Sequence, residues 1–77
     1  THNPFAVNDI YFAREFGIEA ESFNNNGSSL VFGHPQGPTG ARLVAEGVEE
    51  ARQAGGGYVL FAGCAAGDSA AALVLKV

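Results

Sequence analysis

The segment ARLVAEGVEEARQAGGGYVLFA, residues 41–62, predicts a helix that leads through three glycines into a strand. In residues 41–54 apolar side chains recur every three or four positions, and most charged side chains fall between them, which is typical of an amphipathic helix. The glycines at 55–57 end that helix. The continuously apolar run over residues 58–62 predicts a buried strand.

The residues after this strand predict a turn and a second strand. Small residues over 63–68 form the turn, and residues 69–77 are alanine-rich and then aliphatic. Two strands joined by such a turn pair antiparallel. A lone pair of strands is only marginally stable in water, so we expect this pair to extend a larger sheet formed by further polypeptide.

The residues before the long helix predict a shorter helix and two irregular stretches. Residues 10–16 carry an apolar face, with Asn8 or Asp9 as the cap and Gly17 as the stop. A polar, asparagine-rich turn follows. The apolar residues 30–32 form either a buried strand or part of a loop.

Length and composition indicate an α/β segment that is not stable alone. The chain has 77 residues, close to the size at which folding buries only about 60% of the surface of the unfolded chain. Hydrophobic residues make up 47% of the chain, which argues against disorder, but many of them are alanines that bury little area. We therefore treat residues 1–77 as one segment that packs against further polypeptide.

Charge and cysteine content exclude several function classes. The net charge is −4 with only four basic residues, so no basic patch is available to bind nucleic acid, although a small phosphate-bearing ligand that touches only a few groups remains possible. No apolar run approaches the roughly 18 residues of a membrane span, and no metal-ligating cluster is evident. A single cysteine fits a reducing compartment, and we expect a cytoplasmic protein.

The loop Gly33-His34-Pro35-Gln36-Gly37-Pro38-Thr39-Gly40 surrounds a titratable group with residues that restrict or strain the backbone. Thr39 is the expected N-cap of the long helix. His34 has a plain alternative, a loop histidine satisfied by backbone hydrogen bonds. The rigidity of the loop favours instead a preorganised site.

Cys64, the only thiol, lies in the predicted turn among small residues. Its plain alternative is a small buried hydrophobic residue at the end of a strand. Small neighbours leave room for a substrate and expose backbone N–H groups that can stabilise a developing oxyanion. We therefore keep Cys64 as a candidate catalytic residue.

Four motifs in the chain together resemble the thiolase family. They are, in chain order, His2-Asn3-Pro4-Phe5, Asn24-Asn25-Asn26-Gly27-Ser28, Gly33-His34-Pro35 with its glycine-containing continuation, and Cys64-Ala65-Ala66-Gly67. The first resembles the His-Asp-x-Phe motif of sterol-carrier-protein-2-type thiolases, from which Asn3 and Pro4 depart. Ala66 and Asp68 likewise replace glycines that usually follow the cysteine. The resemblance covers essentially the whole chain and implies the C-terminal part of a layered αβαβα fold.

The resemblance also implies a role for each site residue. His34 would polarise the thioester carbonyl in an oxyanion hole and help activate the nucleophilic cysteine. Cys64 would be the general acid and base at the α-carbon of the substrate. His2 would take the place of the residue that positions a water in that oxyanion hole. The backbone N–H of Ala66 would serve a second oxyanion hole, and the expected substrate-binding glycines are Gly33 and Gly67.

The function implied is that of part of a thiolase, an acyltransferase that condenses acyl-CoA or cleaves 3-ketoacyl-CoA. CoA is a substrate, and no cofactor or metal is expected. A thiolase also needs a nucleophilic cysteine, which this chain lacks, so remaining polypeptide or a partner subunit in a homo- or hetero-oligomer would supply it. An inactive thiolase-like module that binds acyl-CoA or a partner protein is the alternative, and an unrelated free-standing domain is a third.

Overall fold

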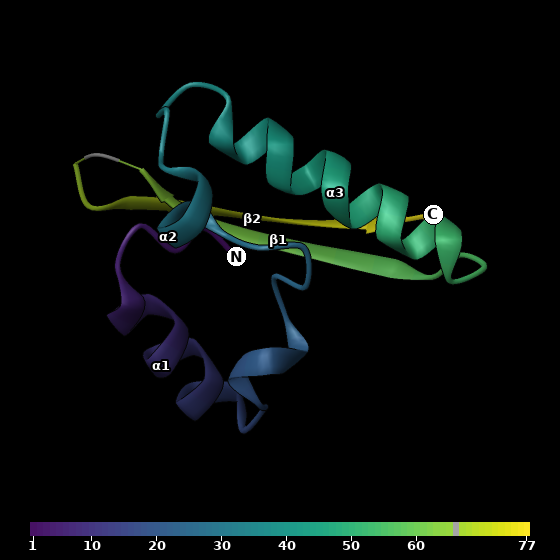
Figure 1. Cartoon of the computed structure of the whole chain (residues 1–77), viewed down its shortest axis with the longest axis horizontal. Helices are drawn as coiled ribbons and strands as arrows, with labels where there is room; N and C mark the ends of the chain where they lie inside the picture. Colours follow the sequence, from purple (N-terminus) through teal and green to yellow (C-terminus); the bar gives the residue numbers. More distant parts are fainter. Residues whose placement is uncertain (66) are drawn as a thin grey trace.

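The computed structural model describes residues 1–65 and 67–77 and is an α/β arrangement (Figure 1). The predicted order of helix, loop, helix, strand, turn and strand is confirmed, with two short helical turns added. The elements are α1 Ala6–Phe16, the 3₁₀ turn η1 Ala20–Ser22, α2 Ser29–Phe32, α3 Thr39–Gln53, β1 Tyr58–Ala65 and β2 Ser69–Lys76.

The sheet is a single antiparallel pair, and α3 packs along β1. Register runs from Tyr58 opposite Lys76 to Ala65 opposite Ser69. Gly47 of α3 lies close to the strand, because a Cβ placed there would lie 2.6 Å from Cγ1 of Val59. Glycine therefore lets the helix lie close to the strand.

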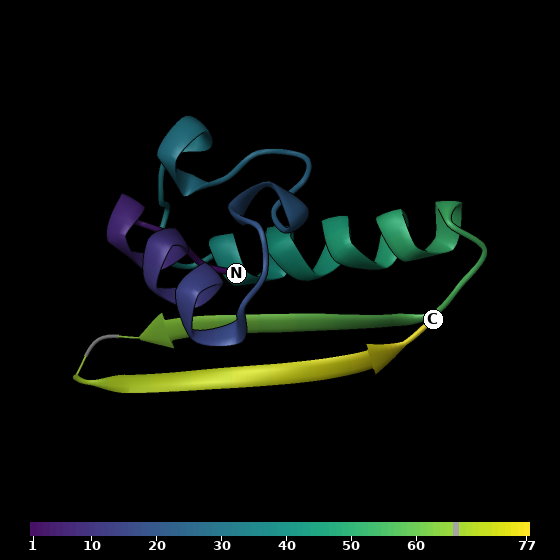
Figure 2. The same ribbon diagram turned by 90° about the horizontal axis from the view of Figure 1, so that it is seen from below.

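The two longer helices lie on opposite sides of the strands. Figure 1 views the sheet nearly edge-on, with α3 on one side and α1 on the other. Figure 2, turned by 90°, shows β1 and β2 side by side, with β1 nearer to the helices. As predicted, α1 ends at Gly17, which adopts a left-handed conformation with φ 64° and donates its N–H to Ala13.

The described residues bury polar rather than apolar side chains. Within residues 1–65 and 67–77 no hydrophobic side chain is buried, and the buried residues are His2, Asn3, Ser28, Ser29 and Thr39. The prediction of a buried strand at 58–62 is therefore wrong for this segment, since Tyr58 and Leu60 are exposed. The helix α3 covers only one face of the strand pair. The apolar side chains of residues 58–62 that point to the other face therefore stay exposed in this segment.

The start of α1 differs from the prediction. The helix begins at Ala6 rather than at residue 10, and neither Asn8 nor Asp9 caps it, because Phe5 occupies the cap position without a side-chain hydrogen bond. Asp9 instead lies in the first turn, where its carboxylate accepts a hydrogen bond from the Asn3 amide. A negative charge is favourable near a helix N-terminus, so the acidic residue suits this position.

The apolar run 30–32 is neither a strand nor a loop but part of the short helix α2. Ser28 caps it, with its hydroxyl oxygen accepting from the backbone N–H of Leu30 at 3.2 Å. Gly33 ends it with φ 82° and donates its N–H to Ser29. The cap and the stop override the strand preference of the three apolar residues.

Two further boundaries bear directly on the site. Thr39 is the first residue of α3 rather than its cap, and Pro38 occupies the cap position without a side-chain hydrogen bond. Cys64 lies within β1, opposite Ala70, rather than in a turn. It is exposed, so the alternative of a buried hydrophobic cysteine does not apply. The antiparallel ladder continues through the small residues because Gly63, Cys64 and Ala65 find partners on β2.

None of the helices in the described part of the chain is both long and apolar enough to span a membrane.

Candidate active site

The N-terminal segment holds His2 against the end of β1. The backbone N–H of His2 donates to the carbonyl of Ala62 at 2.9 Å. Its side chain lies close to Gly63, where an added Cβ would come within 3.3 Å of the Cβ of His2. Glycine at position 63 therefore leaves room for the imidazole beside the strand.

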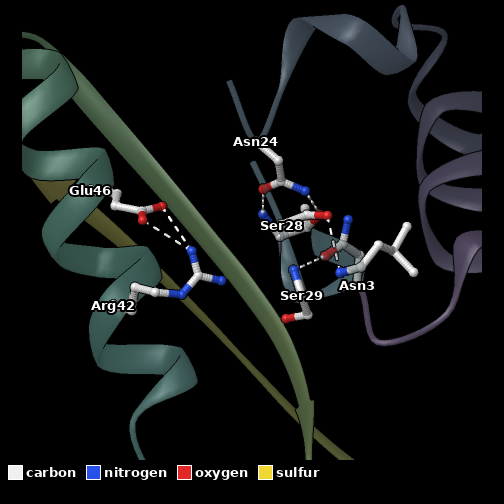
Figure 3. Close-up of polar contacts among 8 residues, drawn as sticks. Asn3, Asn24, Ser28, Ser29, Arg42 and Glu46 are labelled. Carbon is white, nitrogen blue, oxygen red and sulfur yellow. Dashed lines mark hydrogen bonds and ion pairs between the residues drawn. The ribbon is translucent and has the colours of Figure 1, made fainter. Parts of the chain in front are cut away.

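Asn3 fixes the backbone next to His2. Only 1% of Asn3 is exposed, and its amide donates to Asp9 Oδ2 at 2.8 Å. Its carbonyl oxygen accepts from the backbone N–H of Ser29 at 3.1 Å (Figure 3). One side chain thus connects the N-terminal segment to α1 and α2. The asparagine was noted in the sequence only as a departure from a motif, and its structural role was missed.

The segment before α2 is attached to the same region by Asn24. Its side-chain oxygen accepts from the N-terminal amino group of Thr1 at 2.6 Å, and its amide donates to the Thr1 hydroxyl at 3.0 Å (Figure 3). Asn24 adopts φ 54°, a left-handed conformation that asparagine tolerates better than most residues. The asparagine-rich turn therefore holds in place the N-terminal segment that carries His2.

His34 follows α2 and is held by the first turn of α3. Its Nδ1 lies 3.0 Å from Thr39 Oγ1, and the Thr39 hydroxyl donates to the carbonyl of Pro35 at 2.8 Å. Thr39 is only 2% exposed. The motif loop thus closes on itself through one buried hydroxyl, which the sequence analysis treated only as a helix cap.

The three predicted catalytic side chains meet although they come from three separate segments. Nε2 of His2 lies 3.2 Å from Nδ1 of His34, and Nδ1 of His2 lies 3.5 Å from Sγ of Cys64. The two imidazole ring centroids are 4.2 Å apart, with the planes inclined at 45°. His2 therefore connects the thiol to the second imidazole.

Burial and the neighbouring imidazole keep His2 neutral. Loss of solvent lowers the pKa of His2 below its usual 6.5, and proximity to His34 lowers it further, while a hydrogen bond to the backbone of Cys64 opposes both. A second positive charge so close to a protonated imidazole is unfavourable. The pair is therefore suited to carry at most one positive charge at a time.

An open pocket of about 670 Å³ lies beside His2 and Cys64. Val7 and Tyr11 of α1 contribute to its wall, and Ala70 on β2 faces it from the other strand. Small side chains on the strands and larger ones on the helix leave space next to the thiol. A substrate carbon can approach Cys64 from this side.

Among the described residues, no contact connects the glycines predicted to bind substrate with the cluster of His2, His34 and Cys64. Gly33 precedes His34 and adopts φ 82°, and Gly67 adopts φ 77° in the turn after β1. A Cβ built on either would meet no atom within 4 Å among the described residues. Ala66, the predicted backbone donor, lies outside the described residues.

No group of three or more His, Cys, Asp or Glu within residues 1–65 and 67–77 is arranged to hold a metal ion.

The whole of this arrangement lies inside one family match. Residues 1–77 match the family model for thiolase, C-terminal domain. The chain belongs to the thiolase family. The finer likeness to sterol-carrier-protein-2-type thiolases stays a prediction.

Curated relatives of this thiolase segment are bacterial enzymes named 3-ketoacyl-CoA thiolase. The relative from Photorhabdus laumondii is 42% identical over 74 residues, which cover 95% of this chain and 17% of the relative. The one from Erwinia tasmaniensis is 45% identical over 60 residues, 78% of this chain and 14% of the relative. The one from Shigella dysenteriae is 41% identical over 73 residues, which cover 94% of this chain and 17% of the relative. No solved structure matches.

The chain therefore spans about 17% of the length of the relatives that it matches over nearly its whole extent. Within this part of a thiolase, Arg42 is a basic residue near the start of α3. It forms a salt bridge to Glu46 at 3.0 Å, one helical turn along α3 (Figure 3). Its guanidinium also lies over the ring of Phe32, so its contacts are structural.

Proposed function

We propose that this chain supplies the C-terminal catalytic groups of a thiolase that condenses acyl-CoA or cleaves 3-ketoacyl-CoA. The observation that carries the proposal is the meeting of His2, His34 and Cys64, with side-chain contacts of 3.2 and 3.5 Å. The relatives are named 3-ketoacyl-CoA thiolase, which supports the same substrate class. CoA enters as a substrate, and the proposal includes no other cofactor.

Cys64 is proposed as the general acid and base. In cleavage, a nucleophilic cysteine on the rest of the thiolase attacks the 3-keto carbon, and the bond between C2 and C3 breaks. Its electron pair forms the enolate of acetyl-CoA, and the Cys64 thiol protonates C2. CoA then takes the acyl group from the nucleophilic cysteine. In condensation the Cys64 thiolate removes the proton from C2. Its exposed position beside the open pocket supports this role.

His34 is proposed to polarise the thioester carbonyl and to help activate the nucleophilic cysteine. An imidazole that accepts the thiol proton can then donate the new N–H to the oxygen on which enolate charge develops. His2 lines the same oxyanion hole and positions a water there. The neutral form favoured for His2 supports this pairing, since only one of two adjacent rings then needs to carry the charge. The backbone N–H of Ala66 remains the proposed donor of a second oxyanion hole.

The roles are tested by His34→Ala and Cys64→Ala in the full-length thiolase that contains this chain. Each variant should lower kcat for thiolysis by about 10²–10⁴-fold, the range of a lost general acid or base, with acyl-CoA binding preserved. Ser22→Ala is the matched control, because Ser22 is exposed and its hydroxyl bonds only the local carbonyl of Glu19 among the described contacts. Unchanged turnover in both site variants would rule the proposal out.

The same experiment separates the enzyme from the inactive module. A wild-type protein that binds acyl-CoA but shows no turnover in either direction is a binding module. The retention of both imidazoles and the thiol, with His2 in contact with each of the other two, favours the enzyme.

The remaining thiolase polypeptide, or a partner subunit, is proposed to cover the apolar surfaces of this segment. A second pocket of about 590 Å³ between α1, α3 and β1 is lined by Phe12, Phe16, Leu43, Val59 and Phe61 among others. Large apolar openings of this kind mark surfaces that other polypeptide fills. A homo- or hetero-oligomer in the cytoplasm completes the proposal, since a free thiol such as that of Cys64 suits a reducing compartment.

A further inference from the structure

The hydroxyl of Thr39 is placed between a carbonyl and an imidazole. Its Oγ1 lies 2.8 Å from the carbonyl oxygen of Pro35 and 3.0 Å from Nδ1 of His34. A threonine hydroxyl has a single proton to donate and can also accept. The position of that one proton determines what the histidine must do.

The carbonyl of Pro35 can only accept, so the proton of the Thr39 hydroxyl lies between these two oxygens. Without it, two oxygens would approach to 2.8 Å with only lone pairs between them. The hydroxyl then has only a lone pair to offer to His34. A hydrogen bond at 3.0 Å therefore requires that Nδ1 of His34 carries a proton.

The contact with His2 is compatible with this assignment. Nδ1 of His2 lies 3.5 Å from Sγ of Cys64, and Nε2 of His2 lies 3.2 Å from Nδ1 of His34. When the proton of neutral His2 is on Nδ1, its bare Nε2 shares the same Nδ1 proton of His34 that Thr39 Oγ1 accepts.

We propose that Thr39 is a positioning residue that holds neutral His34 in the Nδ1-protonated tautomer and so leaves Nε2 as the nitrogen that exchanges protons with the reacting groups. The hydrogen bond made by one ring nitrogen sets the state of the other. The catalytic part of this proposal rests on the proposed function, whereas the tautomer does not. Nε2 takes the proton of the nucleophilic thiol, which becomes the thiolate, and the resulting Nε2–H donates to the carbonyl oxygen.

The backbone keeps the hydroxyl in place. The N–H of Thr39 also donates to Pro35 at 3.2 Å, so the turn from 35 to 39 is closed by both the backbone and the side chain of one residue. With 2% of Thr39 exposed, water does not readily replace the hydroxyl. The methyl group contributes packing but no hydrogen bond, which allows the two parts of the side chain to be tested separately.

The test uses the full-length thiolase with ¹⁵N-labelled histidine, together with Thr39→Ser, Thr39→Val and the control Ser22→Ala. In the wild type and in Thr39→Ser, the ¹⁵N shifts of neutral His34 should show the proton on Nδ1, and kcat should agree within about twofold. Thr39→Val should give a mixture of tautomers and lower kcat by about tenfold, the effect of one hydrogen bond, with KM nearly unchanged. Ser22→Ala should match the wild type.

Three results would overturn the proposal. The first is a wild-type His34 with its proton on Nε2, which needs no variant at all. The second is Thr39→Val with the wild-type tautomer and wild-type kcat. The third concerns Thr39→Ser, which keeps the hydroxyl, and it is decisive even where Thr39→Val does not fold. The proposal is wrong if His34 of this variant no longer carries its proton on Nδ1, or if its kcat falls tenfold. Failure of the proposed function would show separately. In that case His34→Ala would keep full turnover, while His34 of the wild-type protein would still carry its proton on Nδ1.

Discussion

The buried and the exposed parts of this segment have opposite chemistry. Around His2 a small polar cluster is buried and connected by hydrogen bonds, with Asn3, Ser29 and Thr39 as its inner members. Among the described residues the Ser29 hydroxyl and Asp9 Oδ1 have no hydrogen-bond partner. On α1 and β1, by contrast, large apolar side chains such as Tyr11 and Tyr58 are exposed. Hydrogen bonds are directional, so this cluster can define the site geometry locally. Apolar burial needs area, which this segment alone does not provide.

The largest expected effect comes from isolating the segment. Residues 1–77 expressed alone should show no cooperative unfolding transition and should self-associate or bind a hydrophobic dye, because no apolar side chain of the described residues is buried. Thermal unfolding followed by circular dichroism, together with light scattering, measures both properties. A monomer with a sharp transition would show that the polar cluster suffices for folding.

Asn3→Ala in the full-length thiolase tests how much the buried polar cluster contributes to stability. It leaves the buried backbone N–H of Ser29 and the carboxylate of Asp9 without their partner. We expect a loss of about 2–4 kcal/mol in the free energy of unfolding, since each unsatisfied group costs about 1–3 kcal/mol. Denaturant titration measures it. Asn26→Ala, at an exposed asparagine, is the control, and an equal loss in both variants would contradict the special role of Asn3.

Gly47→Ala tests the close contact between α3 and β1. An added Cβ would lie 2.6 Å from Cγ1 of Val59, so the helix or the strand must shift, at a cost of about 1–3 kcal/mol. Gly37→Ala is the matched control, because a Cβ at that position meets no described atom within 4 Å. Denaturant midpoints of the two full-length variants measure the difference. Equal midpoints would mean that this contact is loose.

The smallest expected effect is a pH dependence of stability. The pKa of folded His2 lies below 6.5, so the unfolded chain binds more protons at this site as the pH falls through that value. Stability contributed by neutral His2 is therefore present above about pH 6.5 and is lost progressively below it. Between about pH 7.5 and 5.5 the full-length wild type should lose more in Tm than His2→Gln, measured by thermal unfolding at each pH. Identical slopes for the two proteins would contradict the shift.

The sequence was informative where the pattern is local and repeated. Period and composition predicted α3, both strands and their antiparallel pairing, and Gly17 was recognised as a helix stop. Resemblance to a family, rather than spacing, brought the two histidines and the cysteine together. The resemblance implied one shared site, and in the structure His2 contacts both His34 and Cys64.

What the sequence did not predict depends on partners far along the chain. The role of Asn3 requires Ser29, which is 26 residues away, and nothing in the N-terminal motif indicates that contact. The hydroxyl of Thr39 can cap a helix or bond a neighbouring ring, and only the position of His34 decides between them. Burial of 58–62 was overestimated because apolar character cannot show whether a covering surface is present.

The position of Cys64 inside β1 has a consequence for how such a chain can change over evolution. Side chains of a strand alternate between faces with a period of two, so one residue inserted or deleted between 58 and 63 would turn the thiol to the opposite face from the one that meets His2. A two-residue change would restore the face but move the thiol by about 7 Å along the strand. Length variation is therefore expected to accumulate in other segments, and the interval between the three glycines and the cysteine should stay constant.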